Sequence, residues 1–451
     1  MQNTKENKMG TMPENKLILS MSVPIMISML IQALYNIVDS MYVAQISESA
    51  LTAVSLAFPY QNLMIAVGTG TGVGVNALLS RSLGEKDFKL ANRTANNSLF
   101  LAVAISALFV ILGIVFARPF IALQTNNKEI LEQGTSYLMI VSIVSVGLFG
   151  QICTERLLQA TGKTIYSMIT QGLGAIINII LDPIMIFGYG PLPMMGTAGA
   201  ALATVIAQII AAIIGIILNI SINKELKLSI KGMLPNSLII KKIYSVGVPS
   251  ILMASIGSVM TFSLNRILIS FTETAVAVFG AYFKLQSFIF MPVFGLNNGV
   301  VPIIAYNLGA KKPERIKKTI KLALIYAVSF MLAGLVIFQT VPEILLSKLF
   351  SASAEMIKIG VPALRIISIN FIFAGFCIVA ISVFQAVGKG LYSLWISIAR
   401  QLVVLIPVAY LMSLTGNLNN IWLAFPIAEL TSVIVALAFL KRVYRKIINS
   451  L

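Results

Sequence analysis

Residues 17–46 read LILSMSVPIMISMLIQALYNIVDSMYVAQI, and this stretch decides the class of fold. It exceeds the roughly 20 residues that a helix needs to cross the hydrocarbon core of a bilayer. Its only charged residue is Asp39. Because backbone groups in lipid must be hydrogen-bonded within their own segment, such a run predicts a helix. A barrel strand is excluded because its apolar residues would alternate with polar ones.

The rest of the chain has the same character. Hydrophobic residues make up 58% of its 451 positions and charged residues only 11%, whereas a soluble domain has about 25% charged residues. We therefore expect an all-α integral membrane protein. The apolar runs predict twelve transmembrane helices, at 17–46, 51–80, 94–117, 131–158, 164–189, 197–221, 243–270, 275–306, 319–341, 359–386, 391–414 and 420–440.

The basic residues predict the orientation. The chain has 33 Lys and Arg against 16 Asp and Glu, and most of the basic residues lie in the N-terminal segment and in every second loop after it. Positive charge in short loops marks the cytoplasmic side, which places both termini there. The net charge of +17 then orients the protein and contacts anionic lipid, so no nucleic-acid partner is expected. The absence of histidine removes the commonest metal ligand.

An internal repeat divides the chain into two halves. At a shift of 225 residues, 23–24 (Val-Pro) falls on 248–249, and after one added residue 162–163 (Gly-Lys) falls on 388–389. Two halves with the same orientation predict two pseudo-symmetric six-helix bundles, an arrangement typical of transporters. We expect a cytoplasmic tail at 1–16, a first bundle at 17–221, a basic linker at 222–242, a second bundle at 243–440 and a basic tail at 441–451.

Acidic residues inside spans are costly and usually functional. The first half has Asp39 and Asp182, and Asn178 lies four residues before Asp182, on the same helix face. Such a group can take up a proton or hold Na⁺ through oxygen ligands. The alternative is structural: Asp39 as an interior hydrogen-bond partner, and Asp182 as a helix-end residue.

The second half lacks this acidic pair. Its matching positions hold Leu264 and Val408. Glu429 could mark a second ion site or be paired with a nearby cation. The polar candidates of this half are Asn265, Arg266, Lys284 and Glu429.

Pro24 lies inside the first span and predicts a hinge, because proline removes a backbone hydrogen bond and permits a bend. The glycines between 68 and 74 predict close helix packing. Aromatic rings and thioethers suit a permissive site for organic cations, although each such residue could equally be ordinary packing. The candidates for a substrate cavity are Tyr35, Phe58, Gln61, Met64, Phe149, Phe283, Gln286 and Met291.

Several motifs carry a resemblance to a known family. They are 36–39 (NIVD), 178–183 (NIILDP), 299–310 (GVVPIIAYNLGA), 159–162 (QATG) and 385–388 (QAVG). With the twelve spans and the repeat, the chain resembles the MATE (multidrug and toxic compound extrusion) family over essentially its whole length. The wording of the motifs is most similar to the MepA-like branch of Gram-positive bacteria.

The resemblance implies a secondary active exporter of amphipathic or cationic compounds, driven by H⁺ or Na⁺. It implies a V-shaped pair of bundles that rock about a substrate cavity, as a monomer in the bacterial cytoplasmic membrane and without a cofactor. It assigns coupling to Asp39, Asn178 and Asp182, with possible Na⁺ there, and adds Thr204 as the hydroxyl of the sixth span. The acids that some members have in spans 7 and 10 have no counterpart here.

Two other functions compete with this interpretation. A lipid-linked precursor flippase of the same superfamily would commonly have fourteen spans and a cationic cavity, and Arg266, Lys284 and Arg365 keep that alternative open. An integral membrane enzyme is disfavoured because the sequence shows no metal cluster and no nucleophile with a matching base.

Overall fold

The computed structural model describes residues 6–189, 193–350 and 352–451, and every regular element in these ranges is a helix. Within the described residues, ten helices are long and apolar enough to cross a membrane. Two bent helix pairs pass the same test together, so the count reaches the predicted twelve if each pair is one span. The first pair is α5 (Lys128–Ile143) with α6 (Val146–Ala160), bent by 47°, and the second is α13 (Ala354–Ser368) with α14 (Phe371–Ala386), bent by 48°.

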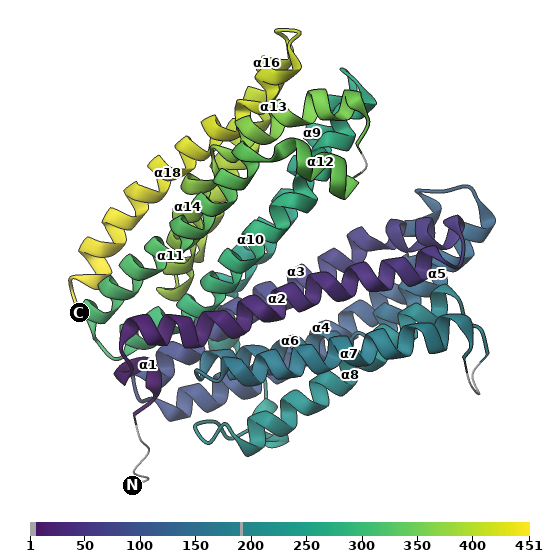
Figure 1. The fold of residues 1–451 in the computed structure, drawn as a ribbon. Coiled ribbons are helices and arrows are strands. Elements are labelled where there is room, and N and C mark those ends of the chain that lie inside the picture. Colours follow the sequence, from purple (N-terminus) through teal and green to yellow (C-terminus); the bar gives the residue numbers. More distant parts are fainter. Residues whose placement is uncertain (1–5, 190–192, 351) are drawn as a thin grey trace. The chain divides into compact units, whose positions relative to one another are not determined.

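The remaining helices follow in chain order (Figure 1). Those of the first half are α1 (Lys8–Thr11), α2 (Glu14–Ala44), α3 (Glu48–Gly84), α4 (Phe88–Ala122), α7 (Thr164–Phe187) and α8 (Thr197–Ser221). The linker has a short 3₁₀ helix, η1 (Ile230–Met233). Those of the second half are α9 (Ser237–Ile269), α10 (Glu273–Gly309), α11 (Pro313–Thr340), α12 (Pro342–Phe350), α15 (Gly390–Ile398), π-helical η2 (Ala399–Leu405), α16 (Ile406–Ser413), α17 (Leu418–Trp422), α18 (Ala424–Val443) and π-helical η3 (Tyr444–Ile448).

The internal repeat is visible in the lengths of the helices. Helices α3 and α10 each have 37 residues, and both their first and last residues are 225 positions apart. Lys86 and Lys311 follow them with left-handed backbone, at φ 59° and 53°. Gly162 and Gly388, the glycines of the two QAxG motifs, end α6 and α14 at φ 83° and 75°, where a side chain would be strained. The two halves therefore repeat in their turns as well as in their spans.

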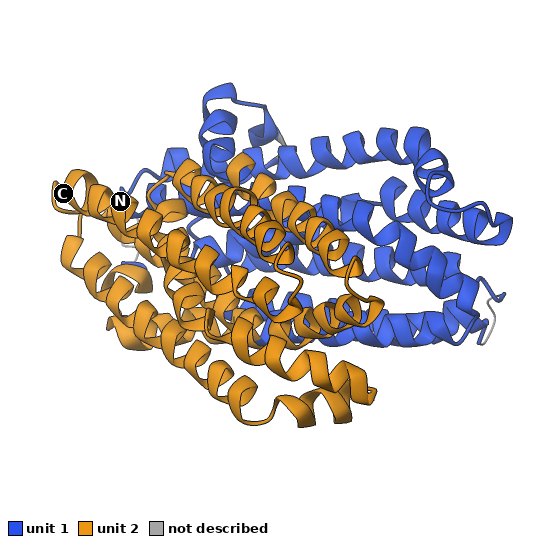
Figure 2. Ribbon diagram, turned by 90° about the horizontal axis from the view of Figure 1, so that it is seen from above, with its two compact units in different colours: residues 1–7, 27–247 blue, residues 8–26, 248–451 orange. Residues whose placement is uncertain are grey.

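The chain divides into two compact units whose limits differ from the predicted bundle limits at 17–221 and 243–440. Unit 1 consists of residues 1–7 and 27–247, and unit 2 of residues 8–26 and 248–451 (Figure 2). The first turns of α2 thus belong to unit 2, and the first turns of α9 belong to unit 1. Pro24 and its repeat partner Pro249 lie within three residues of these two crossing points.

Matching glycines of α3 and α10 form close helix contacts near these two places. A Cβ atom on Gly74 of α3 would lie 2.1 Å from the carbonyl oxygen of Ile243, in the part of α9 that belongs to unit 1. In unit 2, a Cβ atom on Gly299 of α10 would lie 2.4 Å from Oγ of Ser22, in the first turns of α2. The close packing predicted for the glycine run is therefore present, and it recurs in the second half.

The basic linker is attached to unit 1 by a row of asparagines on α4. Asn92, Asn96 and Asn97 accept hydrogen bonds through their side-chain oxygens from backbone N–H groups of the linker. The donors are Lys227 at 2.5 Å, Ser229 at 2.8 Å and Asn236 at 2.8 Å. Because three side chains bind its backbone, the linker is an ordered part of unit 1.

The N-terminal segment is anchored in both units. In unit 1, the amide of Asn7 donates hydrogen bonds of 2.9 Å to both carboxylate oxygens of Glu225. In unit 2, Glu14 is buried and forms ion pairs with Arg315 at 3.2 Å and Lys318 at 2.9 Å. The two anchors differ in kind, since one carboxylate is bound by an amide and the other by two cations.

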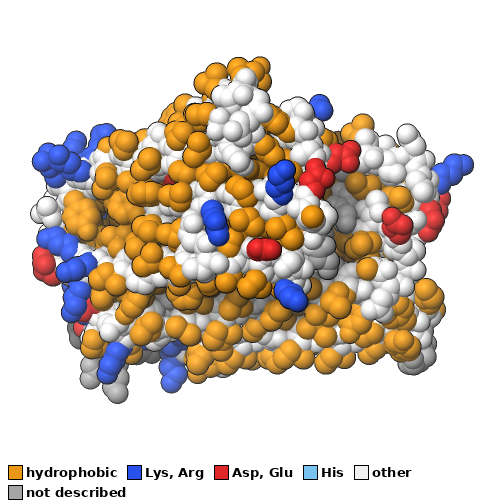
Figure 3. All heavy atoms as spheres, turned by 45° about the horizontal axis from the view of Figure 1, so that its top comes forward, with side chains coloured by type: hydrophobic (Ala, Val, Ile, Leu, Met, Phe, Trp, Pro, Cys, Tyr) orange, Lys and Arg blue, Asp and Glu red, His pale blue; other side chains and the backbone are white. Residues whose placement is uncertain are grey.

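The outer surface is apolar. Figure 3 shows one face of the molecule, on which hydrophobic side chains predominate and charged side chains are few. On α4, Ile111, Ile114 and Phe116 are each more than half exposed. Large apolar side chains without cover need lipid around them, so the chain is a multi-pass membrane protein.

Candidate functional site

Three helices of unit 1 bring four of the predicted site residues together. Asn178 and Asp182 are one turn apart on α7, and the Asn178 amide donates to Oδ1 of Asp182 at 3.2 Å. The same amide donates to Oγ1 of Thr204 on α8 at 3.4 Å, and that hydroxyl donates to the carbonyl of Ala200 at 3.0 Å. Asp39 on α2 interacts electrostatically with Asp182.

Three oxygens of this cluster are buried and have no hydrogen-bond partner among the described residues. They are Oδ1 of Asp39, Oδ1 of Asn178 and Oδ2 of Asp182. Asn178 and Asp182 are 3% and 0% exposed, so water does not satisfy them from the surface. Buried polar groups in proteins are nearly always hydrogen-bonded, and exceptions need an explanation. Oxygen atoms alone suit a hard cation such as Na⁺, or a proton shared by the carboxylates.

A cluster of three or more metal-ligating side chains is a different arrangement, and none occurs among the residues that the structure describes. The group at Asp39 contains two carboxylates, an amide and a hydroxyl. It therefore fits a weakly held, exchangeable cation better than a resident transition metal.

Two tyrosines and a third acid belong to the same region, and the sequence interpretation missed two of these three residues. The Tyr35 hydroxyl lies within electrostatic range of Asp39, Glu155 and Asp182. Tyr137 lies in range of both aspartates and accepts a hydrogen bond of 3.1 Å from Gln61. Residues on α5 and α6 approach α2 only through the tertiary fold, so sequence spacing carried no signal for them.

Glu155 needs a new interpretation. Its position near the end of the fourth span favours a solvated side chain, but the structure leaves it only partly exposed. Oε1 of Glu155 accepts a hydrogen bond of 2.9 Å from Gln151, one turn earlier on α6. With Asp39 and Asp182, unit 1 thus has three carboxylates within electrostatic range of Tyr35.

The other cavity candidates of the first half are dispersed. Met64 is 1% exposed and belongs to the core, whereas Phe58 is 59% exposed. Phe149 is buried and stacks on Phe109 with 5.5 Å between ring centroids. Of this group, the structure brings Tyr35 and Gln61 into the region of the acids.

The candidates of the second half do not form a comparable cluster. Phe283 belongs to an aromatic group, 4.7 Å from Phe279 and 5.6 Å from Tyr282 between centroids. Arg266 and Lys284 are exposed, and the Arg266 guanidinium lies 5.9 Å from the ring of Phe262. The remaining three, Asn265, Gln286 and Met291, are partly exposed.

Glu429 is paired with a cation. Its carboxylate is 4% exposed and lies 3.3 Å from the guanidinium of Arg400. Arg400 stands in the π-helical segment η2, which interrupts its span between α15 and α16. Such segments are frequent at functional sites, and this one carries the basic partner of the acid. Both oxygens of Glu429 accept from Nη1 of Arg400, so the acid is neutralised within unit 2.

The similarity to a known family covers both halves of the chain. A model of the MatE family matches residues 24–184 and 249–411, one segment in each half. Multidrug export protein MepA of Staphylococcus haemolyticus (strain JCSC1435) is 29% identical over 435 residues, which cover 94% of this chain and 92% of that protein. MepA of Staphylococcus aureus (strain MRSA252) is 27% identical over 427 residues, with coverage of 94% and 93%.

Solved structures show the same fold. One, described as the outward-facing conformation of a multidrug resistance MATE family transporter of the MOP superfamily, is 26% identical and has a TM-score of 0.89 over 98% of both chains. A MOP superfamily transporter from Pyrococcus furiosus, 24% identical, has a TM-score of 0.90 over 98% of both chains.

Proposed function

Because the chain belongs to the MATE family of transporters, we propose that it is a secondary active multidrug exporter. Its substrates are amphipathic or cationic organic compounds, and it exchanges them for H⁺ or Na⁺. The names of its staphylococcal relatives and the acidic cluster of unit 1 support this proposal.

One observation supports the proposal that the acidic cluster of unit 1 binds the coupling ion. The Asp39, Asn178 and Asp182 side chains place three unpartnered oxygens in the interior of unit 1. A site of this kind is incomplete without a cation or a proton. In unit 2 the buried acid Glu429 already has Arg400, so coupling belongs to unit 1.

The proposed mechanism follows from charge. Binding of the ion at Asp39 and Asp182 removes the negative charge that attracts a cationic substrate. The ion and the substrate therefore favour different states, which is the condition for any ligand-driven shift. Alternating movement of the two units, with α2 bending at Pro24, then exposes the site to each side of the membrane in turn.

The proposed setting is the cytoplasmic membrane of a bacterium, with both termini in the cytoplasm. The basic loops support this orientation and the contact with anionic lipid. We expect the chain to work as a monomer and to need no cofactor besides the coupling ion.

Export of ethidium by inside-out vesicles tests the proposal. An imposed proton gradient and an imposed Na⁺ gradient are applied separately to the wild type and to Asp39→Asn. We expect one gradient to drive export in the wild type and to fail in the variant. Glu314→Gln, which removes an exposed carboxylate with a surface ion partner, is the control and should behave as the wild type. Undiminished coupling in Asp39→Asn would sink the assignment.

A further inference from the structure

Unit 2 has a positively charged side chain at the middle of a membrane span. In the span Gly390–Ser413, Arg400 stands ten residues after the first position and thirteen before the last. At 1.5 Å per residue, at least roughly 15 Å of helix separates it from either end. An arginine side chain does not extend that far toward the lipid headgroups, so the guanidinium needs a partner inside the protein or a water-filled space.

The partner inside the protein occupies only part of the guanidinium. Nη1 of Arg400 donates to both carboxylate oxygens of Glu429, at 3.3 Å and 3.5 Å. Among the residues that the structure describes, these are the only hydrogen bonds of the arginine side chain. Nε and Nη2 have no partner there. These two nitrogens share one edge of the planar group and form the fork that binds a carboxylate through two parallel hydrogen bonds.

The fork is accessible. The side chain of Arg400 is 27% exposed, whereas that of Glu429 is 5% exposed. Charged groups within spans face a bundle interior or a water-filled cavity, because exposure to hydrocarbon is costly. The exposed part of the guanidinium therefore faces a space that water and solutes reach. The buried acid holds one nitrogen in place and leaves the fork to a ligand.

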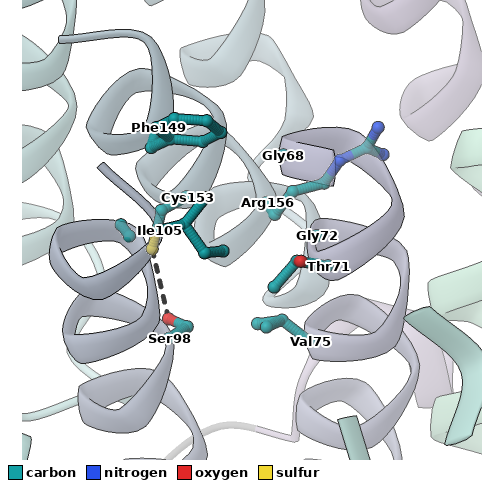
Figure 4. A pocket seen from close by; sticks show the side chains of 10 residues that line it. Gly68, Thr71, Gly72, Val75, Ser98, Ile105, Phe149, Cys153 and Arg156 are labelled. Atoms are coloured by element: carbon teal, nitrogen blue, oxygen red, sulfur yellow. Dashed lines mark hydrogen bonds between the residues drawn. The ribbon is translucent and has the colours of Figure 1, made fainter. Parts of the chain in front are cut away.

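The buried arginine of unit 1 is arranged differently. Arg156 is 9% exposed and lies four residues before the end of α6. Its guanidinium donates to Gln159 at 3.0 Å, and a Cβ atom on Gly72 would lie 2.7 Å from its Cγ. Arg156 forms part of the wall of a cavity of about 20 Å³, which has room for a water molecule and not for an organic ligand (Figure 4). It is a packing residue, and Arg400 is not its counterpart.

Packing does not require the charges of unit 2. At the matching positions unit 1 has Gly174 and Ala203. A Cβ atom on Gly174 would lie 3.2 Å from Cβ of Ala211, so small residues pack closely there. A buried ion pair is often no more stabilising than apolar residues of similar volume. Stability alone therefore does not explain the pair of Arg400 and Glu429.

We propose that Arg400 binds the carboxylate of zwitterionic substrates, which are amphipathic compounds with one positive and one negative charge. The inference rests on the proposed function and adds a substrate class to it. A phosphate group also fits the guanidinium fork, but lipid headgroups lie at the ends of the span, out of reach of Arg400. Glu429 orients the guanidinium, and its negative charge opposes the bound carboxylate, which keeps the binding reversible.

Two dyes that differ in one group test the proposal. Rhodamine B has a free carboxylate, and its ethyl ester lacks that charge. Fluorescence polarisation measures the Kd of each dye for the purified full chain in detergent. Arg400→Lys keeps the charge and removes the fork. We expect it to weaken the binding of rhodamine B, relative to the ester, by at least about tenfold, the loss typical of hydrogen bonds between charged groups.

A second variant and a control accompany this measurement. Arg400→Met combined with Glu429→Met leaves neither charge unpaired and should show the same selective loss. Arg365→Lys makes the same change at an exposed arginine of α13 and should keep the wild-type ratio of the two Kd values. An equal effect on both dyes in the Arg400 variants, or a wild type that does not bind rhodamine B, would overturn the proposal. Selective binding without export of either dye from inside-out vesicles would contradict the proposed function and not the role of Arg400.

A third variant separates recognition from structure. Glu429→Gln retains an oxygen acceptor for Nη1 of Arg400 and removes the charge that opposes a bound carboxylate. We expect rhodamine B to bind several-fold more tightly relative to its ester, because the positive charge of the guanidinium is then uncompensated. A pair with a purely structural role would instead lose affinity for both dyes. Weaker relative binding of rhodamine B in this variant would contradict the assignment of the fork.

Discussion

Units 1 and 2 have related helix arrangements but differ in the partners of their buried acidic residues. In unit 1, Asp39 and Asp182 retain oxygens without partners. In unit 2, the matching positions hold Leu264 and Val408, and the buried acid Glu429 is paired with Arg400. Unpartnered groups are available to a ligand, whereas a paired acid contributes to the structure of its own unit. The comparison shows that two halves with a common fold can differ in their buried acids, which lack partners in one half and are ion-paired in the other.

A second pair of matching positions also differs between the two units, in the size and charge of the side chains that pack together. In unit 1 the large side chain of Arg156 lies over Gly72. The corresponding residues of unit 2, Ser382 and Asn297, form a hydrogen bond between their side chains. Unit 1 thus packs a large side chain against a glycine, and unit 2 packs two side chains of intermediate size at the same place, without a buried cation.

The largest expected effect concerns the ion pair of unit 2. Arg400→Met leaves Glu429 buried without a partner, and breaking such a pair costs about 3–5 kcal/mol. The double variant Arg400→Met with Glu429→Met should recover most of this loss, because it removes both charges. Denaturant unfolding in detergent measures both. Additive losses in the double variant would show that the pair is not the stabilising unit.

The second prediction contrasts the acids of the two units. Asp182→Asn should abolish the effect of the coupling ion on substrate affinity, a loss of roughly 5–150-fold, the usual range of such coupling. The double variant at Arg400 and Glu429 should retain the ion effect. Substrate titrations with and without the ion measure both. Loss of the ion effect in the double variant alone would place coupling in unit 2.

The third prediction concerns the glycines at which α9 and α2 pack. Gly74→Ala and Gly299→Ala should each destabilise the protein by about 1–3 kcal/mol, because their Cβ atoms would overlap fixed neighbours. Gly280→Ala on α10 is the control, since a Cβ atom there meets no atom within 4 Å among the described residues. Thermal unfolding compares the three. A loss in only one of the two tight variants would show that the units depend unequally on these contacts.

The smallest effect concerns the anchor of the N-terminal segment in unit 1. Burial raises the pKa of Glu225, and the Asn7 amide and the charge of Lys163 only partly offset this. The folded state therefore favours the protonated form. The stability that Glu225 contributes is complete below its unfolded pKa, and it is lost as the pH rises through its raised folded pKa.

Glu225→Gln should remove this dependence. The melting temperature of the wild type, relative to the variant, should fall as the pH is raised from below 4 to above 7. Glu314→Gln, which makes the same chemical change at an exposed position with a surface partner, is the matched control. A difference that rises with pH would mean that the carboxylate is favoured in the folded state.

Much of the fold could be predicted because a lipid bilayer permits few backbone conformations. Apolar runs of sufficient length must be helices, and the repeat at a shift of 225 residues predicted two related halves. Asp39, Asn178 and Asp182 were also predictable, because a carboxylate in an apolar run stands out and a spacing of four residues defines one face of a helix.

Other features could not be predicted because they depend on contacts between residues that are far apart in the sequence. Glu155 and Tyr137 reach the acids only when α5 and α6 pack beside α2, and the sequence has no pattern that links them. The same holds for the asparagines of α4 that bind the linker. Pairing of Glu429 specifically with Arg400 depends on a π-helical segment that no periodicity indicated.

The sequence by itself therefore determined the spans, the repeat and the asymmetry of the acids. Each of these follows from local rules, since lipid requires internal hydrogen bonds and tolerates few charges. Only the tertiary structure decided where α2 and α9 pass from one unit to the other and which acids have partners. These are questions of which groups meet across the fold, and the free energy of a buried charge or hydroxyl depends on its neighbours in space.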